Sequence, residues 1–92
     1  MTIKVSKIDA SLQRKGFKKT THSDHNRFYL YIGEEKQVVQ TKISHGEDEI
    51  RDTLISKMSH QLHLEKSDFI RFVECPLQFE EYIQILKKKD VL

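Results

Sequence analysis

The sequence of 92 residues is poor in cysteine and proline and has no long apolar run. Its single cysteine, Cys75, has no second cysteine with which to form an internal disulfide, a zinc knuckle or a redox pair. No apolar stretch approaches the roughly 18 residues of a membrane span, and the first twenty residues lack the continuous apolar core of a signal peptide. We therefore expect a cytoplasmic protein with no membrane contact, held together by hydrophobic burial.

The length of the chain predicts a single domain over residues 1–92. A chain this short buries only a little over ~60% of its unfolded surface and cannot support two cores. Hydrophobic residues make up 37% and charged residues 33% of the chain, and the apolar residues recur at regular spacings. Together these features indicate a small folded domain without repeats or linkers.

The charge is unevenly distributed although the net charge is only +2. Residues 1–46 contain nine lysines and arginines against four acids, which gives +5, and residues 47–92 contain seven against ten, which gives −3. A basic first half suits an anionic partner such as nucleic acid. Solvated lysines on a small domain are the alternative explanation.

A first helix is predicted over residues 7–15. Ser6 is a suitable N-cap, and Asp9 lies where a capping box has its acid. Gly16 suits the left-handed residue that follows a helix end.

The following segment has the two-residue period of strands. We predict a short strand over residues 17–21 and then a hairpin with its turn at residues 33–36. With that turn, the numbers of opposite residues sum to 69. The buried pairs are then Leu30 with Val39 and Phe28 with Thr41, and the outward pairs are Tyr29 with Gln40 and Arg27 with Lys42.

Three helices are predicted in the second half. The acids at 47–49 suit the first turn of a helix over residues 48–62, which would bury Ile50, Leu54, Met58 and Leu62. Ser67 is expected to cap a short helix that Pro76 separates from a last one. The inward residues of these two helices would be Phe69, Ile70, Phe72 and Val73, and then Phe79, Tyr82, Ile83 and Leu86.

The predicted fold class is α+β, with the order α-β-β-β-α followed by two short C-terminal helices. A three-stranded antiparallel sheet with helices packed on one face would leave its other face open to solvent.

The open face and the open end of the hairpin carry the residues that could perform chemistry. Strand pairing should bring His25 and His45 together, with His25 facing Ser44. A neutral imidazole can remove a proton and an imidazolium can return one near pH 7, as transesterification of RNA through its 2′-hydroxyl requires. Arg27 and Lys42 could hold the phosphate. Tyr29 is placed to stack an unpaired base. The alternative interpretation of His25 and His45 is that both are solvated polar residues at strand ends.

Metal binding has little support in the sequence. His60 and His63 are spaced i, i+3 on a predicted helix, which is compatible with metal ligands, but no third ligand accompanies them. We therefore expect neither a metal nor a cofactor.

Three short segments resemble the HicA family of small RNA-cleaving toxins, also called YcfA-like proteins. They are Lys-Gly-Phe at 15–17 after the first helix, Ser-Asp-His at 23–25 before an alternating strand, and Ile-Ser-His at 43–45 before a helix. The resemblance covers roughly residues 3–72. It assigns residues 1–64 to a HicA-like core and residues 65–92 to a helical extension.

The resemblance implies a fold and an activity. HicA proteins share a double-stranded-RNA-binding-domain-like fold and act as metal-independent mRNA interferases of type II toxin-antitoxin systems, neutralised by a HicB antitoxin. Their essential histidine carries over onto His25 and the second histidine of the pattern onto His45. The Gly-Phe pair after the first helix carries over onto Gly16 and Phe17.

Three functional hypotheses follow. The first is a HicA-like endoribonuclease that uses His25 and His45, assisted by Arg27 and Lys42. The second is an RNA-binding module without catalysis on the same scaffold. The third is a protein-interaction adaptor that works through C-terminal aromatic residues, which also fit a purely structural role in the core: Phe69, Phe72, Phe79 and Tyr82.

Overall fold

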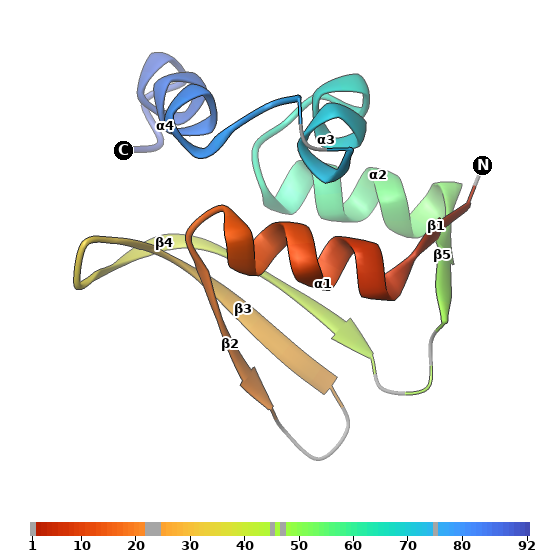
Figure 1. The fold of residues 1–92 in the computed structure, drawn as a ribbon. Coiled ribbons are helices and arrows are strands. Elements are labelled where there is room, and N and C mark those ends of the chain that lie inside the picture. Colours follow the sequence, from red (N-terminus) through yellow and green to blue (C-terminus); the bar gives the residue numbers. More distant parts are fainter. Residues whose placement is uncertain (1, 22–24, 45, 47, 75) are drawn as a thin grey trace.

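The computed structural model describes residues 2–21, 25–44, 46, 48–74 and 76–92 and has an α+β fold (Figure 1). Strands pair in the order β2-β3-β4 to form an antiparallel sheet, and the described helices lie on one side of it, as predicted. A small second sheet joins β1 to β5. The elements are β1 (Thr2–Lys4), α1 (Val5–Arg14), β2 (Phe17–Thr21), β3 (His25–Ile32), β4 (Glu35–Ser44), β5 (Glu49–Arg51), α2 (Asp52–Gln61), α3 (Lys66–Val73) and α4 (Phe79–Lys88).

Helix α1 begins two residues earlier than predicted. Lys4 occupies the N-cap position without a side-chain cap, so the predicted cap at Ser6 is wrong. Asp9 does not close a capping box; it accepts hydrogen bonds from Gln13 and Lys19. The helix starts early because β1 delivers the chain directly into it. The predicted end is confirmed, because Gly16 has a φ of +95°.

The register of the central hairpin agrees with the prediction over its open half. His25 lies opposite Ser44, Arg27 opposite Lys42, and Tyr29 opposite Gln40. The same two strands shift register nearer the turn, where Tyr31 lies opposite Lys36. The predicted direct pairing of Leu30 with Val39 is therefore not made, although both residues are buried.

The shift arises from a shorter turn than expected. The strands end at Ile32 and Glu35, so the loop is Gly33-Glu34 rather than residues 33–36. Gly33 has a φ of +62°, as tight hairpin turns require. The two extra residues are taken up as an irregularity in β4, where Val38 is 74% exposed. Because the shift is by two residues, every side chain stays on its predicted face.

Helix α2 is shorter than predicted. Residues 49–51 form β5 instead of a first helical turn, and Ile50 pairs with Ile3 of β1. The periodicity in the sequence gave no sign of this pairing between distant segments. The helix therefore buries Ile55 with Met58, while Leu54, expected in the core, is 39% exposed.

The two C-terminal helices complete the core. Phe69, Phe72 and Tyr82 are fully buried, which agrees with a structural role in the core. These three residues are therefore not exposed for contact with a partner protein, as the adaptor hypothesis would need. The ring of Phe72 lies 5.1 Å from that of Tyr82 and 6.3 Å from that of Phe17, measured between centroids. Glu65, not Ser67, is the N-cap of α3. Cys75 lies outside the described residues.

Helix α1 caps the C-terminal end of α3. The buried ammonium of Lys15 donates to the Phe72 carbonyl and lies 4.8 Å from the centre of its ring. Ser11 Oγ donates to the Val73 carbonyl at 2.8 Å. These contacts satisfy carbonyls that have no partner within their own helix, at the end where the helix dipole favours a cation.

Candidate functional site

The face of the three-stranded sheet turned away from the helices, here called the open face, is basic. Because neighbouring side chains of a strand alternate in direction, the buried Phe17, Phe28 and Leu30 define the opposite face. The described residues of strands β2–β4 include one acid, Glu35. It pairs with Ile32, and both residues alternate with the side chains that point outward. The cations of the outward row are Lys18, Arg27, Lys36 and Lys42.

Two half-buried tyrosines lie among these cations. Tyr29 and Tyr31 are two residues apart on β3 and project from the same face. The Lys36 ammonium lies 3.8 Å from the centre of the Tyr29 ring, and that of Lys18 lies 4.3 Å from the centre of the Tyr31 ring. Such cation–π contacts at a surface are weak enough for an incoming base to replace. The open face therefore combines ring surfaces with exposed cations.

His25 begins β3 in the same outward row. Its Nε2 accepts a hydrogen bond of 3.1 Å from Nε of Arg27. In this contact the guanidinium of Arg27 is the donor and the Nε2 atom of His25 is the acceptor. An imidazole beside a guanidinium supplies the two kinds of group that proton removal next to a phosphate needs.

The predicted partner of His25 lies outside the described residues. Those residues do establish that His25 is opposite Ser44, the residue that precedes His45 in the chain. His45 itself lies outside the residues that the structure describes. The juxtaposition of two imidazoles therefore stays a prediction.

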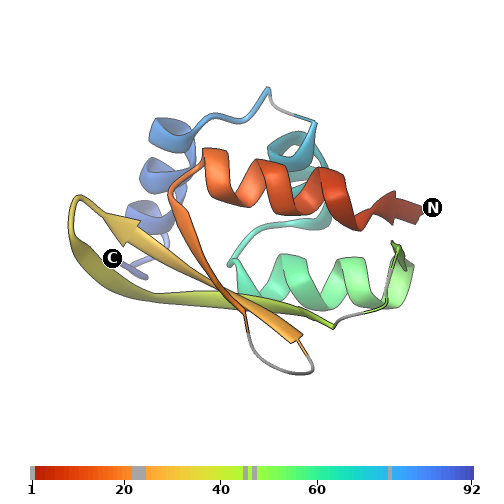
Figure 2. The ribbon, with the colours of Figure 1, turned by 60° about the horizontal axis from the view of Figure 1, so that its bottom comes forward.

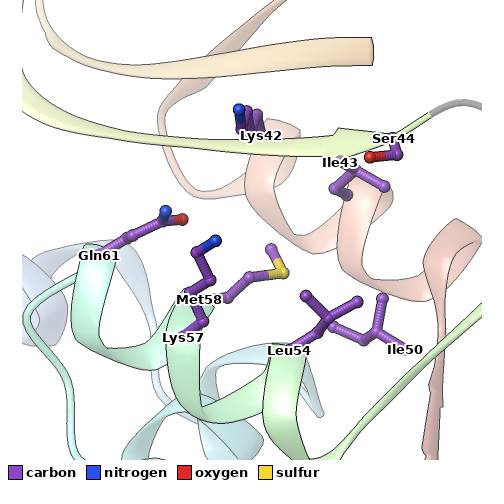
Figure 3. A pocket seen from close by; sticks show the side chains of 8 residues that line it. All are labelled: Lys42, Ile43, Ser44, Ile50, Leu54, Lys57, Met58 and Gln61. Carbon is purple, nitrogen blue, oxygen red and sulfur yellow. The ribbon is translucent and has the colours of Figure 1, made fainter. Parts of the chain in front are cut away.

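A pocket that the sequence did not predict lies between the edge strand β4 and helix α2 (Figure 3). Both helices α1 and α2 cover the same face of the twisted sheet (Figure 2). The pocket has a volume of about 110 Å³. Its apolar wall consists of Ile43 from β4 and of Ile50, Leu54 and Met58, whose side chains point toward that strand. Leu54, which was expected in the core, is partly exposed and contributes its side chain to this wall.

The rim of this pocket carries hydrogen-bond donors. Ser44 contributes from β4, and Lys57 and Gln61 contribute from α2, whereas Lys42 lines the pocket with its ammonium group directed to the other side of β4, toward the open face (Figure 3). The carbonyl oxygen of the Gln61 side chain accepts from Thr41 Oγ1 at 2.7 Å, which leaves its two N–H donors for other partners. No carboxylate occurs among the described residues that line the pocket.

The pocket is continuous with the open face. A shallower depression of about 360 Å³ shares Lys42 and Gln61 with it and reaches Arg27. Sequence periodicity places Lys57 and Gln61 on one side of a helix, but only the packing of α2 beside β4 makes them neighbours of Lys42. These two residues could not have been found from the sequence.

The two histidines considered as metal ligands do not share a helix. His60 lies in α2, whereas His63 follows the helix end with a φ of +61°. Across the described part of the chain, no three histidine, cysteine or acidic side chains gather as metal ligands would. The described helices also include none that is long and apolar enough to cross a bilayer.

Comparison of the chain with protein-family models, with curated proteins and with solved structures finds no match. Function must therefore be inferred from the side chains of the open face and from the groups around them.

Proposed function

We propose that this protein is a HicA-like endoribonuclease that binds single-stranded RNA on the open face and cleaves it with His25. The observation that carries this proposal is the contact between His25 and Arg27 within a row of cations and tyrosines that has no described carboxylate. Phosphates of RNA would be held by the cations, and unpaired bases would stack on Tyr29.

The proposed reaction is a transesterification. His25 Nε2 accepts the proton of a 2′-hydroxyl as its oxygen attacks the adjacent phosphorus, and the bond from phosphorus to the 5′-oxygen breaks. We propose His45 as the acid that protonates the leaving oxygen. The products are a 2′,3′-cyclic phosphate and a 5′-hydroxyl. Arg27 would turn from His25 to the phosphate and, with Lys42, stabilise its growing negative charge.

A second function, RNA binding without cleavage, is favoured by one observation. The Nε2 lone pair of His25, which the reaction needs, is already engaged by Arg27. If phosphate binding does not draw Arg27 away, the open face can still hold RNA while His25 stays inert. With either function, a HicB-like antitoxin is the protein partner we propose, and it would act by covering the open face.

The decisive experiment compares the wild type with His25→Ala in the presence of EDTA. We expect the wild type to cleave single-stranded RNA to 2′,3′-cyclic phosphate ends, because the proposed chemistry needs no metal. The variant should lose cleavage and keep both RNA binding and its circular dichroism spectrum. His60→Ala, which changes an exposed histidine of α2, is the matched control and should retain activity.

Two results would contradict parts of this proposal. Undiminished cleavage by His25→Ala would remove His25 from the mechanism. Salt-sensitive binding without cleavage by the wild type would favour the binding module instead.

A further inference from the structure

We infer that the pocket between β4 and α2 binds one unpaired pyrimidine of the RNA and prefers uracil, which carries a keto oxygen at position 4, to cytosine. This inference rests on the proposed RNA binding and adds a base preference to it.

The size and walls of the pocket suit a single planar ring. An engineered protein cavity of about 150 Å³ lined by apolar side chains binds benzene, and the present pocket measures about 110 Å³ and is open on one side. Ile43, Ile50 and Met58 present their buried side chains to it. The flat faces of a base could lie against these aliphatic groups and the polarisable Met58 sulfur.

The rim then decides which base edge is accepted. The ammonium group of Lys57 is a donor only, and the N–H groups of the Gln61 amide also donate. Uracil presents its O4 as an acceptor, whereas cytosine presents an exocyclic amino group at the corresponding position. An amino group facing these donors would lose its hydrogen bonds to water without replacement.

The location of the pocket allows one RNA strand to occupy it and the open face together. Lys42 lies opposite Arg27 in the outward row and also lines the pocket. The depression that joins them shares Gln61 with the pocket. A strand whose phosphate lies between Arg27 and Lys42 can therefore place a neighbouring base over the rim. An acidic peptide could also meet these lysines, but the adjacent rings of Tyr29 and Tyr31 favour a ligand that stacks.

The test is a binding measurement with short oligonucleotides that cannot be cleaved. Hexamers of 2′-O-methyluridine and 2′-O-methylcytidine differ in the pocket-facing edge and lack the 2′-hydroxyl that the reaction needs. By fluorescence anisotropy with the full chain, we expect the uridine hexamer to bind about tenfold more tightly than the cytidine hexamer, the discrimination typical of paired donors.

Variants connect this preference to the pocket. Lys57→Met keeps the aliphatic stem and removes the donor, and Gln61→Glu replaces two donors by an acceptor while Thr41 can still donate to it. Each should bring the ratio of the two affinities toward one, and the general weakening that follows from the change in charge affects both hexamers and leaves the ratio as the readout. Lys88→Met, on the exposed side of α4, makes the same charge change away from the pocket and should leave the ratio unaltered.

The possible failures are distinguishable. Equal affinities of the wild type for the two hexamers, or a ratio that neither pocket variant changes, would overturn the base pocket and leave the proposed RNA binding intact. Binding of neither hexamer would overturn both. If hexaglutamate binds and Lys57→Met weakens it, while the hexamers bind without preference, the pocket belongs to an acidic peptide and the inference is wrong.

Discussion

At the scale of single residues, Lys15 shows how a charged side chain can be structural. Its side chain is buried, and its ammonium meets the carbonyl end of α3 beside the Phe72 ring. We predict that Lys15→Met lowers the free energy of unfolding by about 1–3 kcal/mol, because a buried carbonyl loses its donor. Denaturant titration followed by circular dichroism measures this change.

The control for this prediction is Lys7→Met. Lys7 forms an ion pair of 2.7 Å with Glu74, and both side chains are about half exposed. Surface pairs of this kind contribute on the order of 0–1 kcal/mol, so the control should stay near the wild type. Equal decreases in the free energy of unfolding of the two variants would show that the buried contact of Lys15 contributes no more to stability than a surface ion pair.

At the scale of elements, Tyr82 joins α4 to the loop after α2. Its hydroxyl donates to the Leu62 carbonyl at 2.9 Å, and burial raises the pKa of Tyr82 above its usual value of 10.0. The unfolded chain therefore releases this proton near pH 10 while the folded chain retains it. The stability that Tyr82 provides is complete below about pH 10 and declines as the pH rises beyond it.

Tyr82→Phe tests this linkage. The variant should lose about 1–2 kcal/mol at neutral pH, because the Leu62 carbonyl is left without its donor. Since the variant has no phenol to titrate at this position, the difference in unfolding free energy from the wild type should shrink between about pH 9 and about pH 11. Urea titrations across this range measure the difference. A difference in unfolding free energy that stays constant with pH would show that folding does not raise the pKa of Tyr82.

At the scale of the whole molecule, the open face carries four of the nine lysines and arginines in the first half of the sequence. If all four of its cations contact phosphates, the logarithm of RNA affinity should fall with the logarithm of salt concentration at a slope of about −3. Removing one cation with Lys36→Met should reduce the slope by about 0.7. The same titration with Lys88→Met should reproduce the wild-type slope. A slope near zero would exclude phosphate binding by this face.

Hydrophobic patterning along the chain was sufficient to predict the fold class and the face on which each hairpin side chain lies. Alternation of apolar residues is a local property, and a register error of two residues does not change it, so Tyr29, Arg27 and Lys42 stayed outward despite the shorter turn. His25 was likewise found at the start of its strand, opposite Ser44.

The tertiary structure alone decided which distant elements meet. The pairing of Ile3 with Ile50 shortened α2 and turned Leu54 outward, and the packing of that helix beside β4 made a pocket with Lys57 and Gln61 on its rim. Contacts between remote segments depend on how the helices share one sheet face, and hydrophobic periodicity within each segment carries no information about that choice.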